Sequence, residues 1–203
     1  MNSLTKITFS IFIVFSLFAC ASKPPAITED VCLIFTEKKS WYKAAKKSEE
    51  NWNIPISVSM AFIKQESSFV ANARPERTQL LGFIPWKRKS SARGYAQAID
   101  GTWEMYLEET GGWFKQRNDF NDAVDFIGWY NNKSVKELGI SRDDARALYL
   151  AYHEGIAGFK KGNHRSKPWL LGVADEVNNQ SIIYNQQLKS CKKKLGRKFF
   201  LFF

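Results

Sequence analysis

Apolar residues recur at helical spacing along most of this 203-residue chain. The clearest stripe, in steps of four and three residues, consists of Leu170, Ala174, Val177, Ser181, Tyr184, Leu188 and Cys191. Such spacing places these side chains on one face of a helix. The sequence shows no internal repeat and no convincing run of alternating strand residues. The pattern therefore predicts a mostly α protein.

Capping residues, glycines and prolines divide this pattern into separate helices. We expect helices over residues 28–39, 41–51, 54–67, 103–109 and 170–191, and two more that begin at Asn118 or Asn121 and at Ser141. The other expected N-terminal caps are Thr28, Ser40 and either Asp100 or Thr102.

Residues 71–93 lack helical periodicity and are expected to form a loop. This segment contains two prolines and a glycine, which favour turns. Its six basic residues are Arg74, Arg77, Lys87, Arg88, Lys89 and Arg93. With the loop included, residues 28–191 predict one domain.

The first 19 residues have the features of an export signal. Residues 7–18 form an apolar run that is too short for a comfortable membrane span. The run ends in Leu17-Phe18-Ala19-Cys20, which resembles the lipobox of bacterial lipoproteins, so Cys20 is expected to carry lipid and residues 20–27 to form a tether. Ala21 is compatible with sorting to the outer membrane, with the domain in the periplasm. An ordinary signal peptide cleaved nearby is the alternative.

Cys32 and Cys191 remain once Cys20 carries lipid. An even number of cysteines in an oxidising compartment favours a disulfide. Both lie on apolar helical stripes, so a bond would tie the first helix of the mature protein to the last. Two buried free thiols are the alternative. The cysteines and two histidines match no zinc or haem pattern, and we expect no metal or other cofactor.

The formal net charge is +10, of which signal removal takes only Lys6. For an exported protein, nucleic acid is not an expected partner, whereas an anionic cell wall or membrane surface is. A basic surface that only aids solubility is the alternative. The tail at residues 192–203 combines basic and aromatic residues, which suits either an anionic bilayer surface or a disordered terminus.

Glu66 ends the apolar helical stretch at residues 54–67, whose Pro55 suits a first helical turn. Phe62 and Ile63 precede Glu66 by four and three residues and share its face. A carboxyl on an apolar face loses hydration, which raises its pKa and allows it to act as a general acid near neutral pH. An exposed glutamate near a helix end is the simpler interpretation of this segment alone.

Three short motifs follow in order: Glu66-Ser67, Gly94-Tyr95-Ala96-Gln97 and Ala151-Tyr152-His153-Glu154-Gly155. Each alone is weak. Together they resemble the lytic transglycosylases related to the soluble lytic transglycosylase (SLT) catalytic domain, whose marks are Glu-Ser, Gly-Leu-Met-Gln and Ala-Tyr-Asn-x-Gly. The resemblance covers residues 52–178 and implies a lysozyme-like fold.

The resemblance implies cleavage of the β-1,4 bond between MurNAc and GlcNAc in peptidoglycan glycan strands, with formation of 1,6-anhydroMurNAc. In such enzymes one glutamate acts first as acid and then as base, which makes Glu66 the expected catalytic residue. Gln97 is expected to bind the sugar, Tyr152 to donate a hydrogen bond near Glu66, and Ser67 and His153 to contact the substrate. We expect a monomer.

The chain departs from the family pattern at three places. Tyr95-Ala96 replaces Leu-Met, His153 replaces the usual Asn, and the segment between Glu66 and Gly94 is longer. The long segment suits either a basic lip that binds stem-peptide carboxylates or a solvated loop.

Two other classes of function fit the same motifs. A lysozyme-type hydrolase on the same fold commonly uses a second carboxylate. The candidates by proximity, each of which also suits a surface or capping role, are Glu76, Asp100, Glu104 and Glu154. The other class is a non-catalytic peptidoglycan-binding lipoprotein, and a membrane-active protein acting through its tail is a further alternative.

Overall fold

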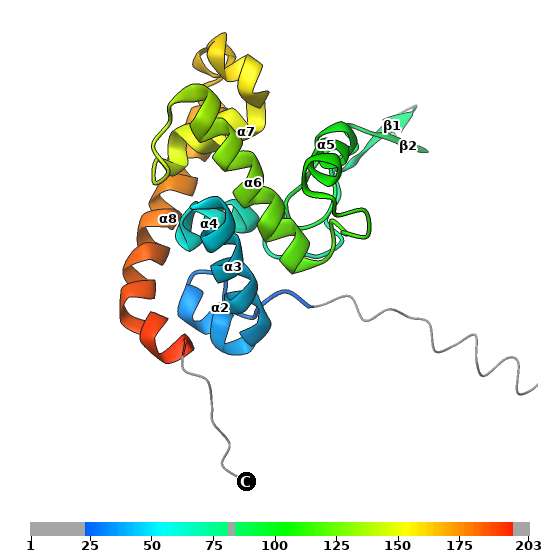
Figure 1. Cartoon of the computed structure of the whole chain (residues 1–203). Coiled ribbons are helices and arrows are strands. Elements are labelled where there is room, and N and C mark those ends of the chain that lie inside the picture. The colour runs from blue at the N-terminus through cyan, green and yellow to red at the C-terminus, as the bar shows by residue number, and fades with distance from the viewer. Residues whose placement is uncertain (1–22, 81–83, 197–203) are drawn as a thin grey trace, which may run out of the picture.

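The apolar stripes form helices in the computed structural model of the protein, which describes residues 23–80 and 84–196 (Figure 1). The elements in chain order are α2 (Val31–Glu37), α3 (Lys39–Trp52), α4 (Ile56–Ser67), β1 (Arg77–Leu80), β2 (Ile84–Arg88), α5 (Asp100–Thr110), α6 (Phe120–Leu138), α7 (Ala145–Lys160), the 3-10 helix η2 (Asn163–Ser166) and α8 (Pro168–Leu195). The prediction of a mostly α, lysozyme-like single domain is confirmed. The expected export signal, Cys20 and the last part of the tail lie outside the described residues.

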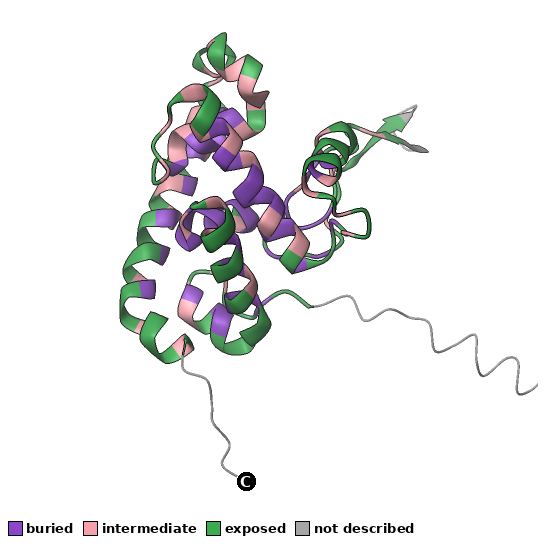
Figure 2. Cartoon of the chain, in the orientation of Figure 1, coloured by how far each residue is buried: buried purple, intermediate pink, exposed green. Residues whose placement is uncertain are grey.

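Helix α4 occupies the centre of the core. All of its residues from Ile56 to Ile63 are buried. A helix that is apolar on all sides must be enclosed by others, and α4 packs against α3, α6 and α8. Figure 2 shows the buried residues gathered where these helices meet. The last turn of α4, which carries Glu66, is less enclosed, because Gln65 is exposed and Glu66 as a whole residue is half-buried, although its carboxyl group is shielded from water.

Aromatic packing fixes the Gly94–Gln97 segment to the helical core. The ring of Trp41 on α3 stacks on Phe120 of α6, with centroids 3.9 Å apart and planes within 1°. Tyr95 makes edge contacts with both rings, at 5.6 Å from each. Tyr95 and Ala96 are buried. The residues that replace Leu-Met therefore anchor this irregular segment in the core.

The expectation that residues 71–93 form only a loop is wrong, because strands β1 and β2 lie within it. They pair antiparallel, with Arg77 opposite Arg88, and Thr78 Oγ1 donates a hydrogen bond to the Lys87 carbonyl at 2.8 Å. Pro85 lies in β2, where the open edges of a two-stranded ribbon tolerate a missing N–H. The hairpin projects beside α5, on the side of the molecule opposite α8 (Figure 1).

Aspartates cap three helices for which the sequence favoured other residues. Asp30, rather than Thr28, accepts hydrogen bonds from Cys32 N and Leu33 N at 2.8 and 3.1 Å. Asp119 caps α6 in place of Asn118 or Asn121, and Asp144 caps α7 in place of Ser141. A carboxylate offers a charged acceptor to the free N–H groups of a first turn, where it also complements the helix dipole.

Three other helix boundaries also differ from the prediction. Ser40 lies inside α3 instead of capping it, and α5 begins at Asp100 with no side-chain cap. Helix α8 runs on to Leu195 and includes the first residues of the expected tail. Among the residues that the structure describes, no helix is long and apolar enough to cross a bilayer.

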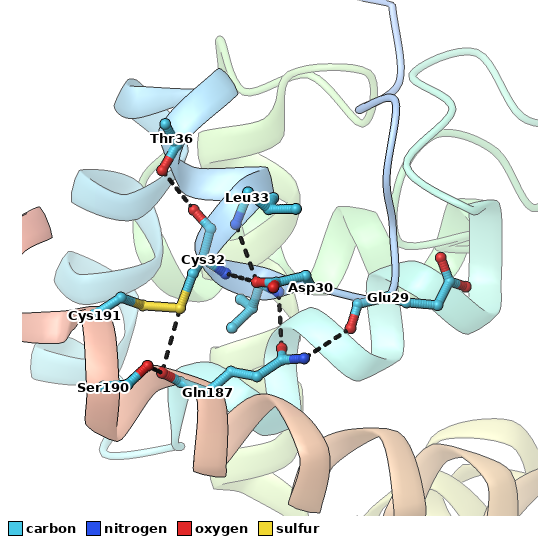
Figure 3. The surroundings of a disulfide bond; sticks show 9 residues. Glu29, Asp30, Cys32, Leu33, Thr36, Gln187, Ser190 and Cys191 are labelled. Atoms are coloured by element: carbon cyan, nitrogen blue, oxygen red, sulfur yellow. Dashed lines mark hydrogen bonds between the residues drawn. A yellow bond between two sulfur atoms is a disulfide. The ribbon is translucent and has the colours of Figure 1, made fainter.

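A disulfide joins Cys32 on α2 to Cys191 on α8, with the Cα atoms 6.1 Å apart (Figure 3). Gln187, one turn before Cys191, reinforces this junction. Its side-chain oxygen accepts from Val31 N at 3.0 Å, and its amide nitrogen donates to the Glu29 carbonyl at 3.1 Å. The two ends of the domain are therefore held together by covalent and hydrogen bonds.

Candidate active site

A cleft of about 640 Å³ brings together residues from all three sequence motifs. Its walls come from the last turn of α4, the Gly94–Gln97 segment and its flanks, α6 and α7. The polar and aromatic lining residues are Glu66, Ser90, Gln97, Thr102, Phe126, Tyr130, Tyr152, His153 and Glu154. Four of the five expected active-site residues thus line one cavity, although 87 positions separate Glu66 from His153 in the sequence.

The Glu66 carboxyl has an unusual environment for an acid. Burial raises its pKa to about 7, because the charged form loses hydration there, while a hydrogen bond from the Tyr149 side chain acts in the opposite direction. Phe126, Tyr130 and Tyr152 line the same cleft. A carboxyl with this pKa is protonated in a large fraction of molecules at neutral pH and can donate a proton.

Tyr152 joins α7 to the Gly94–Gln97 segment. Its hydroxyl donates a hydrogen bond to the Ala96 carbonyl at 2.5 Å, instead of to Glu66. Its ring makes edge contacts with Phe62 of α4 and Tyr130 of α6, at centroid distances of 5.4 and 5.1 Å. Burial, followed by the nearby Glu66 charge, raises the pKa of Tyr152 well above its usual value. Tyr152 therefore stays neutral and forms part of the cleft wall.

Gln97 has a left-handed backbone, with φ of 46°. Its amide nitrogen donates to the Gly94 and Ala73 carbonyls at 2.8 and 3.0 Å. These bonds fix the side chain in the wall and leave its amide oxygen as the group suited to accept a hydrogen bond from a ligand. Gly94 is required beside it, because φ is +79° and an added Cβ would lie 2.0 Å from the Arg117 carbonyl oxygen.

His153 is exposed in the lining of the cleft and contacts the ion pair between Glu154 and Lys167. Its Nδ1 lies 3.1 Å from Glu154 Oε1, and the two Glu154 oxygens lie 2.7 and 2.9 Å from Lys167 Nζ. The Glu154 side chain is only 4% exposed. Lys167, and to a smaller extent His153, lowers the pKa of Glu154. Trp169 lies beside His153, with ring centroids 5.2 Å apart.

The backbone explains why α7 can present these residues. Gly155 adopts φ of 72° and ψ of 156°, which interrupts the helix between its two halves. Only glycine reaches this conformation without strain. The interruption comes directly after Glu154, so the motif that ends in Gly155 closes the first half of the helix at the cleft.

Ser67 is not among the residues that line the cleft. It is buried, and its hydroxyl donates to the Ile63 carbonyl at 3.1 Å within α4. Of the other acids, Asp100 pairs with Arg117 at 2.7 Å, while Glu76 and Glu104 are exposed. Glu154 is the one candidate second carboxylate that lines the cleft.

Tyr149 is the hydrogen-bond partner of Glu66, and the sequence reasoning missed it. It lies three residues before Tyr152 on α7, is buried, and makes an edge contact with Phe62 at 5.2 Å. The charge and hydrogen bond of Glu66 raise the pKa of Tyr149 beyond the effect of burial. Its helical spacing from Tyr152 is the signal that could have placed it on the same face.

Comparison with known proteins agrees with this geometry. The model of the family described as "Transglycosylase SLT domain" matches residues 8–191, which is most of the chain. No curated protein matches the sequence. In the described ranges, no group of three or more His, Cys, Asp or Glu side chains could hold a metal ion. With a lysozyme-like fold, a cleft built from the three motifs and this match, the chain belongs to the transglycosylase SLT domain family, whose members are lytic enzymes of peptidoglycan.

Proposed function

We propose that this protein is a lytic transglycosylase that cleaves the β-1,4 bond between MurNAc and GlcNAc and leaves 1,6-anhydroMurNAc at the new end. The observation that carries this proposal is the Glu66 carboxyl in the cleft, whose pKa burial raises to about 7. Such a group can give up a proton and later take one back at the same pH.

In the first step, the Glu66 carboxyl transfers its proton to the glycosidic oxygen. The bond between that oxygen and C1 of MurNAc breaks, and positive charge develops on the MurNAc ring. Glu66 is then a carboxylate beside this charge and stabilises it. The leaving GlcNAc carries the transferred proton as its hydroxyl hydrogen.

In the second step, the Glu66 carboxylate accepts the proton of the C6 hydroxyl of the same MurNAc. The C6 oxygen forms a bond to C1, which closes the anhydro ring and returns Glu66 to its protonated state. Protons and bonds balance without a water molecule. A single carboxyl therefore suffices for both steps.

The other residues of the cleft have supporting roles in this proposal. Tyr149 donates a hydrogen bond to Glu66 and stabilises its carboxylate form between the two steps. The amide oxygen of Gln97 and the ring of His153 bind sugar hydroxyl or N-acetyl groups. Tyr152 positions the Gly94–Gln97 segment through Ala96.

A lysozyme-type hydrolase is the second candidate, because Glu154 also lines the cleft. The environments of the two carboxyls push their pKa values apart, as in many hydrolases. However, both Glu154 oxygens are engaged by Lys167, and one also by His153. A carboxylate in this state is poorly placed to activate water or attack C1, which favours the transglycosylase.

Mass spectrometry of digested sacculi separates the candidates. The transglycosylase yields anhydro muropeptides, which are lighter by one water than hydrolysed products. Glu66→Gln keeps the size of the side chain but removes the proton, so product formation should fall by about a thousandfold or more. Undiminished digestion by Glu66→Gln, at an unchanged melting temperature, would refute the acid assignment and favour a different catalytic residue. If the wild-type protein binds sacculi but releases no product, the result would favour the non-catalytic lipoprotein.

We further propose that Cys20 carries lipid and anchors the domain to the periplasmic face of the outer membrane. The motif at residues 17–20 supports this proposal. Labelling with a fatty acid in cells should tag the wild type and not Cys20→Ser. Equal labelling of both proteins would refute lipidation at Cys20.

A further inference from the structure

A second cavity lies on the other side of the cleft wall. Pro75 and Ala92 line the active-site cleft, while their chain neighbours Arg74 and Arg93 line a separate cavity of about 290 Å³. The two cavities thus share the wall formed by residues 73–75 and 92–94. The second cavity is therefore adjacent to the cleft.

The lining of the second cavity is basic. It includes four cationic side chains and no acidic one. Two of the four already have partners, since Lys115 pairs with Asp125 at 3.1 Å and Arg117 with Asp100 at 2.7 Å. Within the part of the chain that the structure describes, Arg74 and Arg93 form no side-chain ion pair within 4.0 Å. Both are exposed, so two guanidinium groups are available to a ligand.

The same lining has a surplus of hydrogen-bond donors. The buried Nε of Arg117 has no acceptor among the described residues. Asn72 and Asn118 line the cavity as well, and the Asn118 amide donates to Asn72 Oδ1 at 3.4 Å. Guanidinium and amide N–H groups match the two acceptor oxygens of a carboxylate.

Hydrogen bonds connect the wall between the cavities to Gln97, the proposed sugar-binding residue. The Ala73 carbonyl accepts from Gly94 N at 2.9 Å and from the Gln97 amide at 3.0 Å. Tyr95 N donates to the Arg117 carbonyl at 3.1 Å. These bonds fix the backbone at Ala73 and Gly94, the chain neighbours of Arg74 and Arg93, relative to Gln97.

We propose that the Arg74 and Arg93 guanidinium groups bind a carboxylate of the peptide that substitutes the glycan strand in the cleft. This inference rests on the proposed function. The sugars themselves are uncharged once the lactyl group of MurNAc is joined to the peptide through an amide, so the negative charge of the substrate lies on that peptide. The second cavity would make the enzyme prefer strands that still carry peptides over bare strands.

The test compares two substrates: purified sacculi, and the same glycan strands after an amidase has removed the peptides. The amidase frees the lactyl carboxylate of each MurNAc, so the second substrate keeps a negative charge on the sugar and lacks only the peptide carboxylates. For Arg74→Gln/Arg93→Gln, KM should rise about tenfold on peptide-bearing strands, with kcat little changed, and stay within about twofold on bare strands. Lys87→Gln/Lys89→Gln removes the same charge from Lys87 on β2 and from Lys89 just after it, neither of which lines either cavity, and should leave both values unchanged. Melting temperatures establish that all variants fold.

An equal rise in KM on both substrates, or the same rise in the lysine control, would overturn the proposal that Arg74 and Arg93 bind the peptide. A binding measurement on an inactive variant tests the peptide proposal independently of catalysis. In the Glu66→Gln background, the wild-type cavity should bind intact sacculi more tightly than bare strands, and the double arginine variant should lose that difference. If the wild type cleaves neither substrate but this binding difference holds, the proposed function fails and the peptide site stands.

Discussion

Tyr149 and Glu66 lie 83 positions apart in the sequence, on α7 and α4, yet the Tyr149 side chain hydrogen-bonds to the Glu66 carboxyl. Burial raises the pKa of Glu66 because the charged form loses hydration, and the Tyr149 hydrogen bond lowers it because it stabilises that form. The resulting value of about 7 is a balance of these two effects. Substitution of either residue should therefore change the pH dependence of the protein.

Tyr149→Phe should raise the pKa of Glu66 further, because burial then acts without the opposing hydrogen bond. We expect the alkaline limb of the rate against pH to move up by about half to one unit, with a lower maximal rate because the carboxylate is less stable. Kinetics of muropeptide release between pH 5 and 9 measure this shift. Tyr184→Phe is the matched control, since its buried hydroxyl bonds the Thr28 carbonyl far from the cleft. An unmoved limb in Tyr149→Phe would contradict the proposed partnership.

Glu66→Gln should make the protein more stable at alkaline pH. The folded-state pKa of about 7 lies above the value of 4.5 expected for an unperturbed glutamate, so the folded state binds more protons between these values. Wild-type stability therefore falls as pH rises from 4.5 to 7, relative to the variant. At pH 8–9 the variant should be more stable by ~2 kcal/mol, and near pH 4 the difference should vanish. Urea unfolding at several pH values measures it, and parallel curves for the two proteins would contradict the buried acid.

Lys167→Met should weaken the wall that holds His153. The pKa of Glu154 is lowered chiefly by Lys167, so the pair stabilises the fold above the unfolded pKa of a glutamate and loses that effect as pH falls. We expect a loss of about 1 kcal/mol at pH 7 that shrinks towards pH 3, and a higher KM because His153 is less well oriented. Thermal unfolding at both pH values and steady-state kinetics measure these effects. Lys160→Met, at an exposed position of α7, should change neither.

Gly94→Ala should disrupt both cavities at once. The new Cβ would meet the Arg117 carbonyl oxygen at 2.0 Å, and φ of +79° is unfavourable for alanine. We expect a loss of about 3 kcal/mol or more of the free energy of unfolding, or failure to fold. In Gly101→Ala, where no atom lies within 4 Å of the new Cβ, the variant should be neutral or more stable by about 0.5–1 kcal/mol. Similar unfolding midpoints for the two variants would show that the Gly94 turn relaxes.

The sequence predicted those features that depend on regular spacing. The apolar stripe that ends in Cys191 predicted which face of α8 is buried. The apolar residues before Glu66 predicted the burial that raises the pKa of its carboxyl. The sequence could not single out Tyr149 from the other core aromatics, because its role depends on where α7 crosses α4. The direction of the Tyr152 hydroxyl depends in the same way on the position of Ala96.

Short-range competition explains the other errors. Asp30 and Thr28 are both good caps two residues apart, and the choice depends on where packing starts the helix. The β1–β2 hairpin contains proline and basic residues that are typical of loops. Its strands form because two segments pair with each other, and the preferences of single residues do not describe such pairing.

The disulfide between Cys32 and Cys191 should keep the domain assembled after a protease cuts it once. The bond spans 159 positions and encloses every cleft residue within one covalent ring. A protease that cuts the chain once at the exposed residues 77–79 of β1 would open the ring without releasing either fragment. The two pieces would remain tethered through sulfur and keep the cleft assembled, until a reductant separates them.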